Sequence, residues 1–426
     1  MKKILVILLA TFVVASSLFA NGKPEETSKT EDGKTVISIM HYMGEETKRN
    51  GLKTLCETYT SIHPNVEFEI QAVPYSQFGQ QLQTKIAAGD VPDVIGGRPR
   101  DFKQFVNAGH IEALDGQSFI KDLPESFKNE MSLDGKVYGI PLDYSIKGVF
   151  YNIDMFNEYG IEVPRTYNDF IKVLDTFEAA NQIPFARPFK DTNAPETDFK
   201  GSFHVTLAKQ NPTMWEEIAT GEKHITDFPI FKEELTKYVK RMSYSSFDDY
   251  AYDGSRALQI FAAGEAPMMI NGAWITGDLL SLNPDGNFGC FPIPWSNNPE
   301  DNQYEVKGDD AMMVAKGSEN KDIAIDFINF VGSVEGANIW MDKARLIPTN
   351  VNVVADETMP TLLKELSSNL ANGWGCSSAN VLELTGEPKA IYRQALHALV
   401  GSENLKSDLD GFIEQLDKDL TSALAK

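Results

Sequence analysis

Residues 36–95 contain the pattern that most constrains the fold, because short apolar runs alternate there with amphipathic segments. Residues 36–40 form an apolar run that is typical of a buried strand. The next segment predicts a helix with one apolar face, and residues 63–65 end it. That face comprises Leu52, Leu55, Cys56, Tyr59 and Ile62.

The same alternation continues to residue 95. Residues 66–70 alternate in polarity as a strand does, and residues 78–86 carry an apolar stripe at helical spacing. Gly89 stops this second helix, and residues 91–95 give a third short strand. A chain that runs strand, helix, strand, helix, strand predicts an α/β fold with a parallel sheet.

Polar side chains follow two of these predicted strands. His41, Tyr42 and Glu45 come after the first strand, and residues 96–98, which read Gly-Gly-Arg, come after the third. Ligands of parallel α/β sheets bind beyond the carboxyl ends of the strands. We therefore expect these two groups to lie close together.

The length of the chain predicts more than one lobe. It has 426 residues, and a single hydrophobic core stops growing at roughly 250–300 residues. Residues 187–230 are rich in Pro, Phe, Asn and Thr, which favours loops and short helices. Residues 323–331 predict an amphipathic helix, and residues 391–420 predict paired helices at the C-terminus.

The N-terminus has the pattern of a secretory signal peptide. Lys2 and Lys3 precede an apolar run over 4–15, and small residues follow it. We expect residues 1–20 to be removed after Ala20, with Ser17 as the alternative, and residues 21–34 to be a flexible tether. An uncleaved membrane anchor is the competing interpretation. Since there is no Cys near the junction, we expect a soluble, exported, periplasmic protein without a lipid anchor.

Charge and cysteine usage narrow the function further. The net charge of −22 disfavours nucleic acid and anionic membrane surfaces as partners. Cys56, Cys290 and Cys376 are far apart and form no metal-binding pattern. Cys56 falls on the apolar face of its predicted helix, so we expect it in the core. The sequence leaves open whether Cys290 and Cys376 form a disulfide.

Four segments carry a resemblance to a known family. Residues 88–95 read AGDVPDVI, and residues 136–141 read KVYGIP, with FYN following at 150–152. Residues 264–274 read GEAPMMINGAW, and residues 324–328 read AIDFI, ahead of Ile347, Pro348 and Thr349. In this order and spacing they resemble the family 1 extracellular solute-binding proteins, the sugar-binding group that includes maltose-binding protein. The resemblance covers most of the chain after residue 35.

The resemblance implies the two-lobed periplasmic-binding-protein fold (type II), with the ligand in a cleft between lobes that close by hinge motion. Lobe one would comprise 35–143 plus 308–346, and lobe two 144–307 plus 347–426. The chain would cross near 141–145, 306–309 and 346–349. The partners implied are a small sugar and the membrane permease subunits of an ABC importer, with the protein a monomer and no cofactor or metal.

A sugar site needs an aromatic ring over the apolar face of the sugar and planar polar groups around its hydroxyls. Trp274 is the first candidate, because the family often places a stacking aromatic there. Tyr42 and Glu45 follow the first strand, and Arg98 follows two glycines that allow close backbone approach. The alternatives are a core Trp, a strand-end Tyr, a Glu that favours a helix N-terminus, and a surface Arg.

Further candidates lie at the crossings and in lobe two. Asp143 and Tyr144 flank the first crossing, where a hinge role without ligand contact is the alternative. Asp309 and Asp310 follow Gly308, and only one should face the cleft because neighbouring strand residues point to opposite sides. Weaker candidates are Arg345, Trp374, Arg187, Lys190 and Tyr392.

A secreted glycoside-active enzyme is the main competing class. It would need two carboxylates about 5–10 Å apart, and no local pattern among the 61 acidic residues singles out such a pair. The sequence contains none of the zinc-protease, serine-hydrolase or P-loop motifs. We therefore expect no enzyme activity. A binder of a peptide, a polyamine or iron is the third interpretation.

Overall fold

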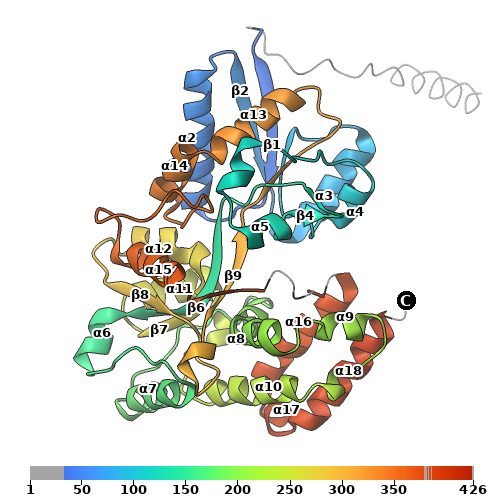
Figure 1. Ribbon diagram of the computed structural model, residues 1–426. Helices are drawn as coiled ribbons and strands as arrows, with labels where there is room; N and C mark the ends of the chain where they lie inside the picture. The colour runs from blue at the N-terminus through green and yellow to red at the C-terminus, as the bar shows by residue number, and fades with distance from the viewer. Residues whose placement is uncertain (1–32, 379–380, 382, 385, 425–426) are drawn as a thin grey trace, which may run out of the picture.

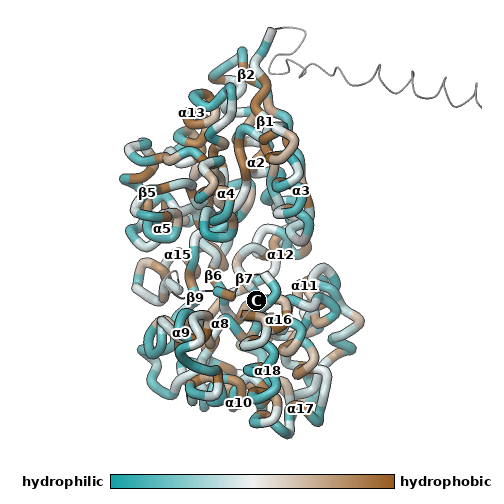
Figure 2. Tube along the Cα trace, turned by 90° about the vertical axis from the view of Figure 1, so that its right-hand side faces the viewer, coloured by the Kyte–Doolittle hydropathy of each residue, from teal (hydrophilic) through white to brown (hydrophobic). Residues whose placement is uncertain are grey.

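The computed structural model describes residues 33–378, 381, 383–384 and 386–424. The predicted signal peptide and most of the predicted tether lie outside these residues. Figures 1 and 2 show two bodies, one above the other, each built on its own β-sheet. This agrees with the prediction of more than one lobe.

The upper sheet has the strand order β10-β3-β1-β2. Its strands are β1 (Thr35–His41), β2 (Val66–Ala72), β3 (Val94–Gly96) and β10 (Met312–Val314). β1 runs parallel to both β2 and β3, which confirms the parallel sheet predicted over 36–95, and β10 joins β3 antiparallel. Figure 2 shows the apolar stretch of β1 inside this body.

Short and long helices surround the upper sheet. They are α2 (Glu46–Ile62), α3 (Tyr75–Ala88), α4 (Lys103–Asn107), α5 (Glu125–Glu130), α13 (Lys321–Val331) and α14 (Val334–Ala344). The apolar face predicted for α2 packs into the core, with Cys56 buried as expected. Ile62 is an exception, since the last residue of the helix is 52 % exposed.

The lower sheet is built around one long strand, β6 (Asp143–Asn152), and has the order β11-β9-β6-β7, with β8 also paired to β6. The other strands are β7 (Met268–Gly272), β8 (Phe288–Phe291), β9 (Tyr304–Asp309) and β11 (Gly375–Ser377). Cys290 on β8 and Cys376 on β11 lie on strands that do not pair with one another, and all three cysteines are free thiols.

Three chain segments meet where the upper body joins the lower one. β6 begins at Asp143, which pairs with Asp309 at the end of β9 and bridges to Pro348. The amide of Tyr144 donates to the carbonyl of Ile347 at 3.0 Å. The three segments predicted to cross between lobes therefore lie side by side, and Figure 1 shows β6 and β9 running between the two bodies.

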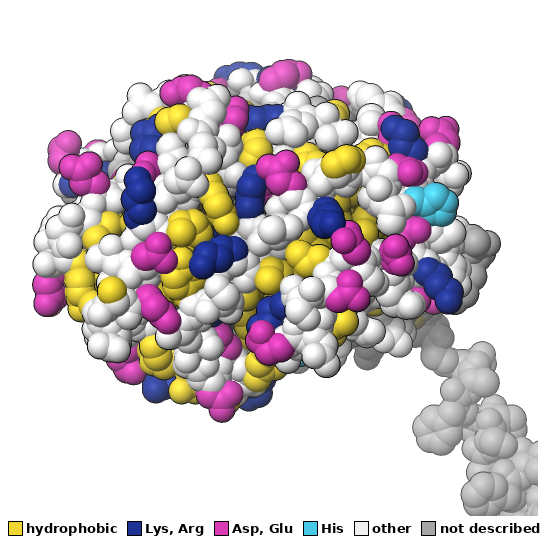
Figure 3. Space-filling model, turned by 90° about the horizontal axis from the view of Figure 1, so that it is seen from below, with side chains coloured by type: hydrophobic (Ala, Val, Ile, Leu, Met, Phe, Trp, Pro, Cys, Tyr) yellow, Lys and Arg dark blue, Asp and Glu magenta, His cyan; other side chains and the backbone are white. Residues whose placement is uncertain are grey.

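Eleven helices of the described chain accompany the lower sheet. They are α6 (Ile153–Glu158), α7 (Tyr167–Ala179), α8 (Ala194–Gln210), α9 (Met214–Ala219), α10 (Pro229–Met242), α11 (Gly254–Ala262), α12 (Thr276–Leu282), α15 (Thr361–Ala371), α16 (Gly386–Val400), α17 (Glu403–Ser407) and α18 (Leu409–Leu424). α16 packs against α18, as predicted for the C-terminus. Figure 3 views this body from below and shows acidic and basic side chains interspersed among apolar ones.

The prediction of loops and short helices over 187–230 was wrong in one respect. α8 is 17 residues long, and twelve of its residues, from Pro195 to Leu207, are buried. A helix that is buried around most of its surface needs no solvent-facing polar side, so its sequence lacks the apolar stripe by which surface helices are usually identified. This hidden helix supplies one wall of the site described below.

Candidate functional site

A cavity of about 680 Å³ lies between the two bodies. Residues from both contribute to its lining, from the carboxyl ends of β1 and β3 and the start of α2 above, and from β6, α8 and α16 below. Eight lysine or arginine side chains and five carboxylates are among the lining residues. The cations are Lys48, Arg49, Arg98, Lys147, Lys200, Lys307, Lys389 and Arg393, and the anions are Glu45, Glu196, Asp309, Asp310 and Glu383.

The upper wall contains Tyr42, Glu45 and Arg98, the groups expected to lie together beyond β1 and β3. The Tyr42 ring meets those of Tyr75 and Phe78 edge to face, with centroids 5.1 and 5.3 Å apart. Burial, followed by the charge of Asp309, raises the pKa of Tyr42, so its hydroxyl stays protonated. Tyr42 therefore offers the cavity a neutral hydrogen-bonding group.

Two glycines bring the backbone close to the Arg98 position. A side chain at Gly96 would come within 2.9 Å of the His41 Cβ. Gly97 has φ of +145° and would place a Cβ against the Phe102 ring. Both positions thus require glycine. Arg98 itself pairs with Asp101 at 2.9 Å, and this carboxylate raises the pKa of its guanidinium.

The junction of the bodies supplies Asp309 and Asp310, and both line the cavity. The expectation that only one would do so was wrong, because Asp310 leaves the strand with a positive φ of 44° and strand alternation ends there. Its carboxylate lies 2.6 Å from Lys48 Nζ. Burial raises the pKa of Asp310 to about 6 against the opposing effect of Lys48.

Trp274 lines the cavity from the turn that follows β7. It is half-buried and packs against the larger core. Its ring lies directly over Gly272, where a Cβ would collide with three of its carbon atoms. Gly272 therefore makes room for the indole, which leaves part of its surface available to a ligand.

The lower wall is a network of ion pairs that links segments far apart in the sequence. Glu196 on α8 contacts Lys200 at 2.7 Å and accepts from Arg393 Nε of α16 at 2.8 Å. Against the effect of burial, these two cations lower the pKa of Glu196 to about 2. Glu383 contacts Lys307, and it lies 3.6 Å from Lys200.

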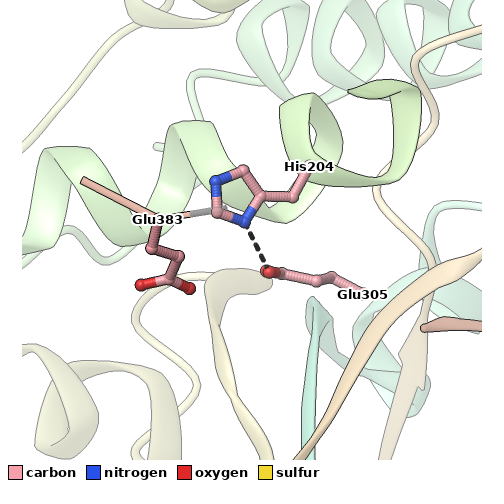
Figure 4. Close-up of side chains that lie close together, drawn as sticks. All are labelled: His204, Glu305 and Glu383. Carbon is pink, nitrogen blue, oxygen red and sulfur yellow. Dashed lines mark hydrogen bonds and ion pairs between the residues drawn. The ribbon is translucent and has the colours of Figure 1, made fainter. Parts of the chain in front are cut away.

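Behind this wall lies a buried histidine-carboxylate group, shown in Figure 4. His204 Nδ1 is 2.8 Å from Glu305 Oε1, and Ser378 also donates to that oxygen. Burial lowers the pKa of His204 to about 4, so the ring is neutral and donates through Nδ1. Glu305 is held in the charged form by Lys147 and Lys307 against the effect of burial.

The ligand atoms of His204, Glu305 and Glu383 lie within 4.8 Å of one another, which raises the question of a metal ion. Their oxygens are already engaged by ammonium groups, since Lys147 and Lys307 contact Glu305 and Lys307 contacts Glu383. A cation placed among these lysines would be repelled. The donor set therefore fits an ion-pair network better than a metal site.

Several predicted site residues lie outside this cavity. Asp143 is buried and accepts a hydrogen bond from Trp340 Nε1 at 2.8 Å, and Tyr144 packs on Phe127. Arg345 ends α14 with a left-handed conformation and pairs with Asp342 at 3.8 Å. These contacts fit the alternative given above for Asp143 and Tyr144, a hinge role without ligand contact.

The remaining candidates are also placed elsewhere. Trp374 stacks beneath Arg165, whose guanidinium carbon is 4.0 Å from the ring centroid. Arg187 is buried and pairs with Asp249, while Lys190 is exposed. Tyr392 is fully buried in the helical core formed by α8, α10, α16 and α18. Each of these side chains has protein partners rather than a place in the cavity lining.

Sequence reasoning missed the charged lower wall. Glu196, Lys200 and His204 lie four residues apart in a segment otherwise rich in Phe. Such spacing places polar groups on one face of a helix, and that signal could have identified both the helix and the wall. Lys389 and Arg393 repeat the spacing on α16.

None of the helices in the described ranges combines the length and the apolar character that crossing a bilayer requires. The chain is 24 % identical to the multiple sugar-binding protein of Streptococcus mutans over 79 % of its length and 80 % of that protein. It is 23 % identical to the melibiose/raffinose/stachyose-binding protein MelE of Bacillus subtilis over 81 % of its length and 82 % of that protein.

Solved structures share the fold. A solute-binding protein RafE in complex with raffinose superimposes with a TM-score of 0.76 at 20 % identity, over 91 % of this chain and 99 % of that chain. A chitin oligosaccharide binding protein gives the same TM-score over 92 % and 100 %. The type II fold expected from the resemblance is thereby confirmed. Residues 44–338 match the family model described as bacterial extracellular solute-binding protein, and the chain belongs to that family.

Proposed function

We propose that this protein is the extracytoplasmic substrate-binding protein of an ABC importer and captures a mono- or oligosaccharide between its two lobes. The observation that carries the proposal is the cavity of about 680 Å³ to which both bodies contribute side chains. That volume falls within the roughly 300–1,000 Å³ of small-molecule sites. Relatives and a structural neighbour whose names refer to sugars support the same ligand class.

The lining has the two kinds of group that a sugar requires. Trp274 can cover the apolar C–H face of a pyranose ring, as aromatic side chains do through their large, rigid surface. Tyr42, Glu45 and Asp309 surround the same space with hydrogen-bonding groups. Because Trp274 comes from the lower body and Tyr42 from the upper, one ligand would contact both.

This arrangement suits capture by lobe closure. Lobe one would comprise 35–143 plus 308–346, and lobe two 144–307 plus 347–426, with the adjacent segments at Asp143, Asp309 and Pro348 as the hinge. Closure is favoured by ligand because only the closed state makes both sets of contacts. Residues 1–20 would be removed on export. The mature monomer, once loaded, would dock on the permease subunits outside the cytoplasmic membrane.

We also propose that the protein binds its sugar without chemical change. A glycoside hydrolase needs one protonated and one free carboxyl on either side of the scissile bond. Four of the five cavity carboxylates, those of Glu45, Glu196, Asp310 and Glu383, have lysine or arginine partners. Carboxylates tied in ion pairs favour binding over proton transfer.

A saccharide panel tests the proposal. A sugar that binds should raise the melting temperature of the mature protein, because a hundredfold excess over Kd adds about 2.7 kcal/mol to the free energy of unfolding. Chromatography should recover the sugar unchanged. Small-angle scattering of the same samples should show a smaller radius of gyration. Cleaved product would favour the hydrolase, and a preference for peptides, polyamines or iron would contradict the sugar assignment.

A further inference from the structure

The charges of the cavity run opposite to those of the protein as a whole. The chain has 61 acidic and 39 basic residues, yet the cavity lining has eight basic and five acidic ones. A cleft lined by an excess of one charge concentrates ligands of the opposite charge. This reversal is the starting point for the nature of the ligand.

The excess is concentrated in the lower wall. Five cations gather there, and they are Lys147, Lys200, Lys307, Lys389 and Arg393. Their carboxylate partners are three, namely Glu196, Glu305 and Glu383. Asp101 also acts on Lys389, but it is already paired with Arg98 at 2.9 Å. His204 is neutral. Among the residues that the structure describes, the wall therefore carries about two positive charges that its own ion pairs leave uncompensated. Residues 379–380, 382 and 385 are uncharged in the sequence.

Lys389 is the cation of the lower wall whose positive charge is least compensated by its surroundings. It lies 3.7 Å from Glu383, a carboxylate that Lys200 and Lys307 also contact. It belongs to the first turn of α16, where the helix dipole disfavours a cation. Burial, with the charge of Lys200, lowers the pKa of Lys389, and burial likewise lowers the pKa of Lys147. The negative charge of a bound anion would stabilise the charged form of both lysines.

We propose that the saccharide captured by this protein is acidic, and that its carboxylate, sulfate or phosphate group binds the lower wall at Lys389, Lys147 and Lys200. The inference rests on the proposed function, since it names the class of sugar for the same cavity. The sugar ring lies between Trp274 and the upper wall, and the anionic substituent faces the lysines. Neutral sugars lack the group that compensates the excess charge.

The first experiment compares matched ligands by calorimetry on the mature protein. Oligogalacturonates, their methyl esters, sulfated and phosphorylated sugars, neutral raffinose and chitin oligosaccharides, and inorganic sulfate and phosphate form the panel. We expect an acidic sugar to bind at least about tenfold more tightly than its neutral or esterified counterpart, with affinity falling as salt rises. The carboxylate, sulfate and phosphate arms identify the anionic group.

The second experiment uses variants. Lys389→Gln should weaken binding of the acidic sugar about tenfold and weaken binding of a neutral sugar much less, whereas Lys389→Arg should retain most of the affinity for the acidic sugar. Lys172→Gln, which removes an exposed lysine paired with Asp169 on α7, is the matched control and should change neither. Melting curves of the free variants show that each is folded, so a loss of binding reports the site itself.

The outcomes separate the two proposals. Neutral sugars that bind as tightly as acidic ones, or a Lys389→Gln variant with full affinity for the acidic sugar, would overturn this inference and leave the proposed function standing. Inorganic anions that bind as tightly as acidic sugars would overturn it as well, because the sugar would then contribute nothing. A protein that binds no saccharide of either kind would contradict the proposed function itself.

Discussion

The indole Nε1 of Trp340 donates a 2.8 Å hydrogen bond to Oδ2 of Asp143, across 197 residues of sequence. Trp340 belongs to α14 of the upper body, and Asp143 is the first residue of β6, where the three crossing segments meet. Both side chains are buried. The bond therefore fixes the proposed hinge segment to a helix of the upper lobe.

Trp340→Phe should lower the free energy of unfolding by about 1–3 kcal/mol, because it leaves a buried carboxyl oxygen without its donor. Urea unfolding measures the change. Asp143→Asn keeps an oxygen that can accept the hydrogen bond. Because burial raises the pKa of Asp143 and so disfavours its charged form, this substitution should lower the free energy of unfolding less than Trp340→Phe does. Equal stability of Trp340→Phe and the parent protein would contradict a structural role for the bond.

Trp274→Ala should weaken the saccharide that the thermal panel identifies by about tenfold or more, since loss of a stacked ring removes roughly 1.5 kcal/mol beyond the area it buries. Gly272→Ala should weaken binding of the same sugar although the new methyl group does not contact the sugar, because that methyl displaces the indole of Trp274. Calorimetry measures both affinities. If both variants bind normally, the ring does not contact the ligand.

The contribution of His204 to the free energy of unfolding should fall as the pH is lowered from about 6.5 to about 4, whereas Asp310, whose folded pKa of about 6 lies above its ordinary value, contributes in the opposite direction. His204 has a folded pKa of about 4 against an ordinary value of 6.5, so below pH 6.5 the unfolded chain takes up a proton that the folded chain refuses. His41 is shifted in the same direction. Glu305 faces His204 with Lys200 and Lys307 nearby, and its lowered pKa places its own loss of stability below about pH 4.5.

His204→Gln retains a donor to Glu305 but does not titrate, so its unfolding free energy should fall less steeply over this range than that of the parent. Urea midpoints between pH 4 and pH 7 provide the comparison. His110→Gln changes an exposed histidine and serves as the control. An unchanged slope in His204→Gln would mean that the ring accepts a proton in the folded state.

Gly277→Ala should destabilise the contact of α12 with α2 and α14. The added methyl would lie 2.6 Å from the carbonyl oxygen of Ala344 and against the Thr47 hydroxyl, so one of the helices must shift. Overpacking of this kind costs about 1–3 kcal/mol, which urea unfolding can detect. Gly317→Ala meets nothing within 4 Å and should stay within about 0.5 kcal/mol of the parent.

The upper sheet was predictable because its pattern is local. In β1 and α2, each apolar position recurs at the spacing of its own element, so neighbouring residues suffice to define it. Tyr42, Glu45 and Arg98 could be placed near one another for the same reason, since parallel strands end at one edge. The placement of Trp274 came from a resemblance over residues 264–274 rather than from periodicity.

The sequence by itself determined the parallel sheet and the apolar face of α2. Only the tertiary structure decided that α8 is buried and that Glu196 meets Arg393, because burial depends on which elements pack around α8 and its ion-pair partners lie up to 197 residues away. The same packing decided the excess of positive charge in the cavity. Net charge can be counted along a chain, but the sign of a cleft depends on which side chains folding brings together.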